Sequence, residues 1–233
     1  MEIKATTIGQ AHAKVCQAIF EDGFELITED GEITYEYSEP VMVIIRHPNM
    51  QPKCSSFNNF GEKAMGEYVK QLLSVNDYDF SYIYGNRLFD FPEYKCGYGY
   101  TRFGDGDGFG FNQIDWIINM LIKEPNTRRA VAMVRYPEID CDTNNPPCLT
   151  TVQFMIRNNA LDMTAYFRSN DMLSAWGNNV YALQALMDYV GTRIVSYGGC
   201  GGCGNLTTIS NSAHMYFKRD AEEVDRMKIE VYK

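Results

Sequence analysis

Two segments that alternate apolar and polar side chains constrain the fold of this chain more than any other feature. They are residues 150–157 (TTVQFMIR) and residues 161–169 (LDMTAYFRS), and strict alternation predicts half-buried β-strands. Asn158 and Asn159 lie between them. Asparagine tolerates positive φ, so a β-hairpin with a two-residue turn is the predicted connection.

A cysteine stands at the open end of this hairpin. Pro146 and Pro147 directly precede Cys148, and their restricted backbone holds the thiol at the mouth of the strand, where ligands have access. The hairpin register places Cys148 opposite residue 169 and beside Arg168. A nearby cation lowers the pKa of a thiol, and a guanidinium also binds phosphate. The pair therefore predicts one pocket that holds an anion and attacks a group attached to it. The alternative is a packing cysteine and a solvated arginine.

Composition limits the classes of protein to which the chain can belong. It has 233 residues and no Pro/Ser-rich linker, so we expect one domain over residues 1–233. The first residues lack the pattern of a secretory signal, and no apolar run is long enough to span a bilayer, so we expect a cytoplasmic protein without a membrane partner. The net charge of −9 disfavours nucleic acid as a partner but permits a local phosphate pocket.

The seven cysteines do not predict a disulfide scaffold, because their number is odd and the chain has the features of a cytoplasmic protein. Cys200 and Cys203 form a CxxC motif among glycines. A four-sulfur zinc site needs a second such pair, which the other cysteines do not supply. We expect incidental thiols in a glycine turn, and no metal site.

Periodicity elsewhere predicts further helices and strands. Helices are expected over residues 8–23, 61–73 and 180–194, and through residues 114–121 up to Pro125. Strands are expected over residues 40–48, from Arg129 onward, and over residues 206–220, with a short polar tail at the end. Asn178 or Asn179 is the expected N-cap of the last helix. Arg128 and Arg129 are expected on opposite faces of their strand, one of them directed at a ligand or a subunit boundary. The equally favoured alternative is two exposed charges.

Several motifs, in this order and spacing, together resemble the thymidylate synthase family. They are YIYGNR, NTRRAVAMVR, PPCLTTVQF, AYFRSNDMLSAWGNNVYAL and SAHMY, from about Tyr82 to Tyr216. The resemblance implies an α+β fold, with a mixed β-sheet whose helices pack on one face and whose other face packs against a second copy in a homodimer. Leu149 stands where bacterial members have histidine, and the loop between Asp171 and Asn179 is short. Both features resemble the compact archaeal branch.

The resemblance implies a nucleophile and a phosphate site. Cys148 matches the family's nucleophile, which adds to C6 of the pyrimidine and makes C5 nucleophilic. Arg168 and Ser169 match the pair that binds the 5′-phosphate. Arg128 and Arg129 match the arginines that the other subunit contributes to that phosphate.

The remaining matches concern the base, the sugar and the folate. Asp171 matches the acid associated with the folate and with ordered water around the pyrimidine. Asn179, with Asn178 as the alternative, matches the asparagine that reads the base, and an amide suits uracil, whereas an aspartate would suit cytosine. His214 and Tyr216 match the pair that binds the deoxyribose 3′-hydroxyl. From the residues alone, a helix cap for Asn179 and a core position for His214 are the favoured alternatives.

Two further residues complete the expected catalytic set. Tyr84 matches the Tyr-Gly segment near the reacting base. The family's general acid/base is a glutamate on an early helix, for which Glu67 is the first choice and Glu62 the alternative.

The sequence also departs from the family's pattern. Residues 26–40 contain no arginine to match the one that the family places on its phosphate loop, and little sequence follows Lys218 to close the site over the folate.

Taken together, these residues predict a methyltransferase that reductively methylates dUMP to dTMP. The co-substrate is 5,10-methylenetetrahydrofolate or a related methylene-pterin of the methanogen type. The alternatives are a hydroxymethylase of the same family, acting on dUMP or on dCMP or CMP, and a catalytically inactive nucleotide-binding regulator.

Overall fold

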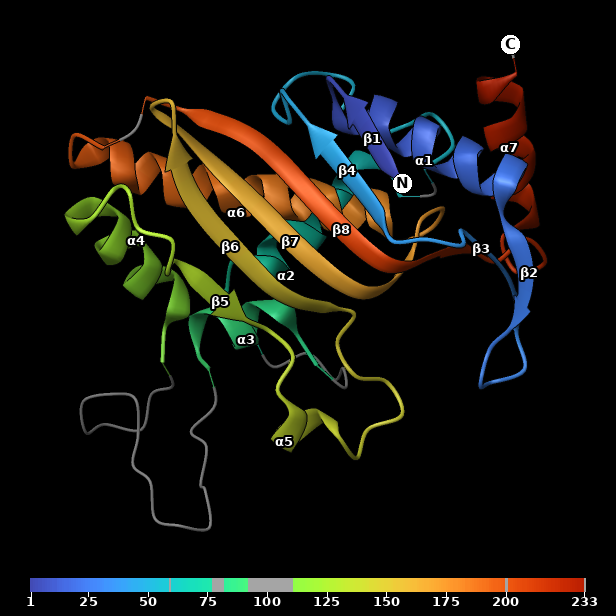
Figure 1. Ribbon diagram of the computed structural model, residues 1–233, viewed down its shortest axis with the longest axis horizontal. Helices are drawn as coiled ribbons and strands as arrows, with labels where there is room; N and C mark the ends of the chain where they lie inside the picture. The colour runs from blue at the N-terminus through green and yellow to red at the C-terminus, as the bar shows by residue number, and fades with distance from the viewer. Residues whose placement is uncertain (59, 77–81, 92–110, 200, 233) are drawn as a thin grey trace.

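The fold is a mixed sheet with helices packed against it (Figure 1). The computed structural model describes residues 1–58, 60–76, 82–91, 111–199 and 201–232. The strands are β1 (Glu2–Ala5), β2 (Phe24–Ile27), β3 (Ile33–Glu36), β4 (Val41–Ile45), β5 (Val131–Met133), β6 (Leu149–Arg157), β7 (Ala160–Asp171) and β8 (Cys203–Met215). The helices are α1 (Ile8–Asp22), α2 (Glu62–Leu72), α3 (Tyr84–Phe89), α4 (Gln113–Lys123), α5 (Pro137–Asp140), α6 (Trp176–Ser196) and α7 (Ala221–Val231). Within the described part of the chain the strand order is β1-β4-β8-β7-β6-β5, and β3 joins β2 to one end of β8.

The predicted hairpin is confirmed, but its register shifts by one residue before it reaches the cysteine. Asn158 and Asn159 have φ values of 49° and 59°, as a two-residue turn with two positive φ angles requires. A β-bulge at Thr150 interrupts the pairing of β6 with β7. The carbonyl of Cys148 therefore accepts a 2.9 Å hydrogen bond from the backbone N–H of Arg168, so the expected pairing with residue 169 is wrong. A bulge adds one unpaired residue, which brings Cys148 directly opposite the arginine.

Strands β7 and β8 are parallel, and α6 makes the crossover between them. In Figure 1, α6 and α2 cross behind β6, β7 and β8, on the side of the sheet away from the viewer. Side chains along β6 and β7 alternate between buried and partly exposed. The buried set faces the helices, so the predicted α+β class with helices on one face of a mixed sheet is confirmed.

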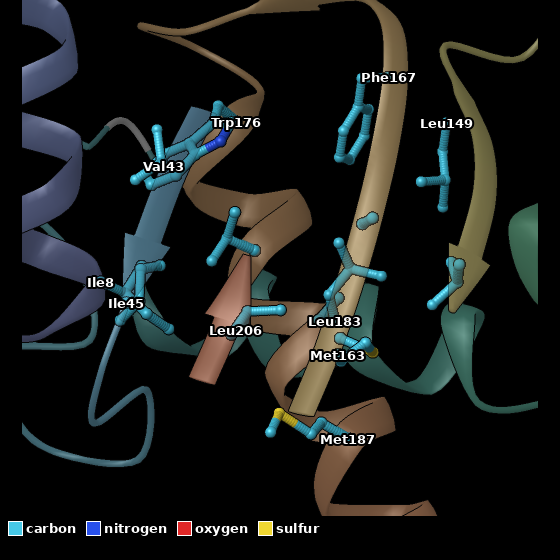
Figure 2. Close-up of a cluster of buried hydrophobic side chains, with 14 of the residues drawn as sticks. Ile8, Val43, Ile45, Leu149, Met163, Phe167, Trp176, Leu183, Met187 and Leu206 are labelled. Atoms are coloured by element: carbon cyan, nitrogen blue, oxygen red, sulfur yellow. The ribbon is translucent and has the colours of Figure 1, made fainter. Parts of the chain in front are cut away.

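The core lies between the sheet and these helices. Figure 2 shows Met163 and Phe167 of β7 in the same cluster as Leu183 and Met187 of α6. Trp176, at the start of α6, is fully buried, and its indole Nε1 donates to Thr208 Oγ1 of β8 at 3.0 Å. A buried indole N–H needs such a partner. This contact fixes the first turn of α6 against the sheet.

Most of the predicted helices are confirmed. α1 begins after Thr7, whose side chain accepts from Gln10 N, and ends at Gly23. α2 occupies the expected segment, and α4 ends two residues before Pro125, because the residue before a proline avoids the helical region. No helix among the described residues is both long enough and apolar enough to cross a membrane.

Three local expectations are wrong. The strand expected from Arg129 begins at Val131, so Arg128 and Arg129 lie in the preceding loop, where Thr127 Oγ1 accepts from the backbone N–H of Arg129. The expected polar tail is α7, whose Val224 and Met227 are buried three residues apart on one helical face.

The third wrong expectation concerns the start of α6. Neither Asn178 nor Asn179 caps this helix, because it begins at Trp176 with Ala175 in the N-cap position. The carboxylate of Asp171 accepts from the N–H groups of Leu173 and Ser174 just before it. This contact orders the approach to the helix, and both asparagines come to lie inside its first turns.

Candidate active site

A cavity of about 660 Å³ lies where the carboxyl ends of β7 and β8 meet the first turns of α6. Ligands bind beyond the carboxyl ends of parallel strands because the crossover leaves a crevice there. Eight residues that the sequence analysis selected line this cavity: Tyr84, Cys148, Arg168, Ser169, Asp171, Asn179, His214 and Tyr216. They come from four elements and from two positions outside them, directly before β6 and directly after β8.

Cys148 and Arg168 lie side by side in the cavity wall. Arg168 Nη2 is 3.9 Å from Cys148 Sγ. The same guanidinium donates from Nη2 to the carbonyl of Pro146 at 2.8 Å and from Nε to the carbonyl of Pro147 at 3.2 Å. Proline has a carbonyl but no N–H, so the two prolines supply acceptors to the arginine while they hold the strand entrance. The Pro-Pro-Cys sequence thus fixes the thiol and its neighbouring cation together.

The thiol of Cys148 is nevertheless less acidic than a free cysteine. Burial raises the pKa of Cys148, Arg168 lowers it, and Asp171 raises it again. Burial is the largest of these effects, because it removes water from the thiolate. The expectation from the sequence was that Arg168 makes the thiolate abundant. For the single chain without substrate this expectation is wrong, and the thiol is mainly protonated at neutral pH.

Three tyrosines surround the thiol. Burial raises the pKa of Tyr68, Tyr82 and Tyr84, so all three remain neutral phenols. The hydroxyl of Tyr84 accepts from the backbone N–H of Leu149 at 3.3 Å. The rings of Tyr82 and Tyr84 lie 5.3 Å apart. These residues enclose Cys148 with aromatic surface and neutral hydroxyl groups.

The two asparagines of α6 have different surroundings. Asn179 lines the cavity, and its Oδ1 accepts from the hydroxyl of Tyr68 at 2.6 Å. Asn178 is buried outside the cavity lining, where its Oδ1 accepts from Asn58 Nδ2 and its Nδ2 donates to the carbonyl of Ser174. Asn179 is therefore the one of the two that is placed to contact a ligand.

His214 and Asp171 are adjacent, because they are register partners on the parallel strands β8 and β7. Burial lowers the pKa of His214, although the carboxylates of Asp171 and Glu36 oppose this shift. A mostly neutral imidazole results, which both donates and accepts hydrogen bonds. Tyr216 is close by, with its ring 5.2 Å from that of His214. These groups form a hydrogen-bonding surface suited to a sugar hydroxyl.

Arg219 is the cation at this end of the cavity. Its Nε donates to Asp220 Oδ1 at 2.7 Å, and its Nη2 donates to Asp171 Oδ2 and Asp220 Oδ2. Its guanidinium also lies 4.0 Å over the ring of Tyr216. These contacts fix the positions of Asp171 and Tyr216 around Arg219. The two carboxylates also largely neutralise the charge of Arg219, so it contributes little to the binding of an anionic ligand.

Comparison with known proteins identifies the family of this chain. Residues 50–230 match the family model described as thymidylate synthase. The chain is 34% identical over 230 residues to the protein named "Putative thymidylate synthase" from Methanocaldococcus jannaschii, covering 96% of this chain and 94% of that one. A protein of the same name from Methanococcoides burtonii is 32% identical, with 97% and 93% covered. The chain belongs to the thymidylate synthase family.

Glu67, the first choice for the general acid/base of the thymidylate synthase family, does not reach the cavity. The side chain of Glu67 is 54% exposed and forms an ion pair with Lys70 at 2.8 Å. Tyr68, Gln71 and Leu72 form the part of the wall that α2 contributes. Residues three and four apart share a helical face, and the residue before Tyr68 points about 100° away. Glu62, the alternative, opens α2, and its side chain lies outside the described part of the structure.

The two arginines that the thymidylate synthase resemblance assigns to the other subunit also lie outside the cavity of their own chain. Arg128 and Arg129 are exposed in the loop before β5. Arg129 Nη2 forms an ion pair with Glu124 Oε2 at 2.8 Å on the surface. They contribute no charge to the chain's own cavity.

Sequence reasoning missed several residues in the cavity wall. The described lining includes four carboxylates and two guanidiniums: Glu29, Asp30, Glu36, Asp171, Arg168 and Arg219. The carboxylates therefore exceed the guanidiniums by two. Glu36 reaches the site because β3 pairs with β8, where it is the register partner of His214. No local sequence pattern predicts this long-range pairing. Arg219, in contrast, could have been selected as a candidate site residue, because it lies three residues after Tyr216.

Cys203, the second cysteine of the CxxC motif, lies away from this site. Cys200 is outside the described residues. Cys203 opens β8, and its Sγ lies 3.1 Å from Asp188 Oδ1. Within the described ranges, no group of three or more histidine, cysteine, aspartate or glutamate side chains is arranged to hold a metal ion.

Proposed function

We propose that this chain reductively methylates dUMP to dTMP, with Cys148 as the nucleophile. The observation that carries the proposal is the placement of Cys148 Sγ 3.9 Å from a guanidinium nitrogen of Arg168 in a cavity that Asn179, His214 and Tyr216 also line. A thiol, a phosphate-binding cation, a base-reading amide and a sugar-binding pair are the groups that this reaction requires.

Arg168 is the proposed anchor for the 5′-phosphate. Its Nε and Nη2 donate to the two prolyl carbonyls, and among the described residues Nη1 has no hydrogen-bond partner. That nitrogen carries two N–H groups. Ser169 follows directly and also lines the cavity, so its hydroxyl adds a donor. A phosphate held there places the attached nucleoside within the same cavity as the thiol.

The proposed chemistry begins with the sulfur of Cys148. The thiolate bonds to C6 of the uracil ring, and the displaced electron pair moves onto C5 and O4. C5 then bonds to the one-carbon unit. Loss of the C5 proton breaks the bond between that unit and the nitrogen of its donor, and transfer of a hydride from the donor to the resulting exocyclic methylene group expels the sulfur of Cys148. Neutral phenols such as Tyr84 donate hydrogen bonds without adding negative charge beside the thiolate. Because burial raises the pKa of Cys148, we propose that the thiolate forms mainly in the closed, substrate-bound site.

The cavity also suits a flat heterocyclic co-substrate. Its volume of about 660 Å³ falls within the range of ligand pockets, roughly 300–1,000 Å³. Leu26, Ile27 and Leu72 give it an apolar wall, and Asp171 supplies a carboxylate that accepts ring N–H groups. Methylenetetrahydrofolate, or a related methylene-pterin, supplies the one-carbon unit and, for a methyl product, the hydride.

The charge of the cavity supports a homodimer as the working form. Four carboxylates face two guanidiniums, and Arg219 is already engaged by Asp171 and Asp220. A phosphate dianion therefore needs further cations. We propose that Arg128 and Arg129 of a second copy supply them, with the helix-free face of the sheet as the interface. That face presents partly exposed side chains, among them Tyr166 at 38% exposure.

The product of the reaction tests the proposed function. Purified protein is incubated with dUMP and methylenetetrahydrofolate, and the nucleotide product is identified by mass spectrometry, with Cys148→Ser as the control. The proposal predicts dTMP together with dihydrofolate, and no product from the variant. Hydroxymethyl-dUMP would instead identify the hydroxymethylase alternative, in which water captures the same one-carbon unit.

Release of tritium from C5-labelled dUMP tests the covalent step separately. Exchange at C5 requires addition of the thiol at C6, whichever product follows. Binding of dUMP without any release of tritium would favour the inactive nucleotide-binding regulator. Full turnover by Cys148→Ser would contradict both enzymatic readings.

A further inference from the structure

The hydroxyl of Tyr68 is the feature of the cavity to which neither the motifs nor the family comparison assigns a role. Tyr68 lies on α2 and lines the cavity, and its hydroxyl donates to Asn179 Oδ1 at 2.6 Å. A short contact between two partly buried side chains 111 positions apart fixes both groups. The contact therefore acts on the residue that reads the base.

This hydrogen bond distinguishes the two ends of the Asn179 amide. A side-chain amide has an acceptor end and a donor end, and rotation by 180° about its last bond exchanges them. Among the described residues, the hydroxyl of Tyr68 has one hydrogen-bond partner, Asn179 Oδ1. Rotation of the amide would present N–H groups to that hydroxyl and leave its partly buried O–H without this acceptor. Losing the acceptor of a partly buried donor costs free energy, so Tyr68 favours one orientation of the amide.

The orientation of an amide decides which pyrimidine it pairs with. Uracil presents an acceptor at O4 and a donor at N3–H, and cytosine presents the reverse pattern at its N4 amino group and N3. One amide orientation complements uracil, and the rotated orientation complements cytosine. A freely rotating Asn179 would distinguish the two bases poorly.

We propose that Tyr68 is a positioning residue for base selection, which locks the Asn179 amide in the orientation that accepts a uracil nucleotide and rejects a cytosine nucleotide. This inference rests on the proposed function, in which Asn179 reads the base. Burial keeps the pKa of Tyr68 high, so its hydroxyl remains a donor throughout the neutral range.

Calorimetric titration of the full chain with dUMP and with dCMP tests the proposal. The wild type is expected to prefer dUMP. Tyr68→Phe removes only the hydroxyl, and we expect it to weaken dUMP binding about tenfold and to narrow the dUMP-to-dCMP preference at least fivefold. Tyr181→Phe is the matched control, because Tyr181 lies on α6 outside the cavity lining, under Lys53. It should leave both affinities unchanged.

A second background separates positioning from general damage. In Asn179→Asp both side-chain oxygens are acceptors, so the direction that Tyr68 imposes no longer matters. Adding Tyr68→Phe to Asn179→Asp is expected to leave the dUMP-to-dCMP ratio unchanged. The thermal unfolding midpoint of each variant shows whether it is folded, and a merely structural role for Tyr68 would lower both affinities equally in both backgrounds.

The outcomes distinguish this inference from the proposed function. If the wild type prefers dUMP and Tyr68→Phe keeps the same ratio, the inference is wrong and the proposed function stands. If the wild type binds neither nucleotide, both are overturned. A ratio that narrows in the asparagine background alone supports the positioning role.

Discussion

Replacement of Arg168 by methionine tests whether one guanidinium holds both the strand entrance and the thiol. Methionine keeps much of the length of the side chain and removes the charge and all the donors. Two hydrogen bonds to prolyl carbonyls are lost, at 2.8 and 3.2 Å, and with them the contact to Cys148 Sγ. Arg168→Lys serves as the comparison, because it keeps the charge without the planar set of donors.

The expected loss of stability follows from these contacts. Hydrogen bonds from charged donors contribute roughly 1.5–3 kcal/mol each when they are buried. Arg168 is only half-buried, so we take about 1 kcal/mol for each bond and expect Arg168→Met to lower the free energy of unfolding by about 2 kcal/mol. Urea denaturation monitored by tryptophan fluorescence measures this value. The buried Trp176 provides a signal that reports on the core.

The same variant has a predicted effect on the thiol. Arg168 lowers the pKa of Cys148, so its removal raises that pKa further and reduces the thiolate fraction at any fixed pH. Alkylation of Cys148 by iodoacetamide, followed peptide by peptide in mass spectrometry, should slow at pH 8 and shift its profile toward higher pH. Arg168→Lys should lie between the wild type and Arg168→Met. An unchanged urea midpoint together with an unchanged alkylation profile in Arg168→Met would refute the reasoning.

Two further predictions concern stability against pH and the shared site. Burial lowers the pKa of His12 from 6.5 to about 4. The folded protein therefore favours the neutral imidazole, and this contribution to the free energy of unfolding is fully present above pH 6.5. It is lost as the pH falls toward 4, by about 3 kcal/mol in total. Urea titrations across this range should show that His12→Gln lacks this component, and parallel pH profiles for wild type and variant would contradict it. For the proposed dimer, Cys148→Ser and a chain with alanine at Arg128 and Arg129 should each be nearly inactive. Refolded together as an equal mixture, the two variants should recover about a quarter of wild-type activity, because half of the dimers are mixed and each mixed dimer has one intact site out of two. The absence of any recovery would argue against shared arginines.

Local features of the sequence allowed much of the fold to be predicted. Adjacent asparagines between alternating segments specify a hairpin because only a turn with two positive φ angles joins such strands so tightly. Helical periodicity specified α2, and Pro125 limited α4. The Pro-Pro-Cys sequence and the arginine of the second strand marked the cavity, because a hairpin brings the two strand ends together whatever surrounds them.

Other features depend on contacts between segments that are distant in sequence. The bulge at Thr150, whose carbonyl accepts from Val134 and Arg135 of the neighbouring segment, moves Cys148 by one register position. The position of Glu36 beside His214 depends on the pairing of β3 with β8. Neither arrangement can be predicted from periodicity in the sequence. Each depends on which segments pack together, and not on the order of residues within a single segment.

The local sequence determined which groups this protein brings to its site: a thiol at a strand mouth, a guanidinium opposite it, and an amide in the next helix. Tertiary structure decided their properties. Burial outweighs the nearby cation and keeps the thiol of Cys148 protonated, the turn of α2 directs Tyr68 rather than Glu67 into the cavity, and Tyr68 orients Asn179. Desolvation and the direction of a hydrogen bond depend on everything that surrounds a group, and only the folded chain specifies those surroundings.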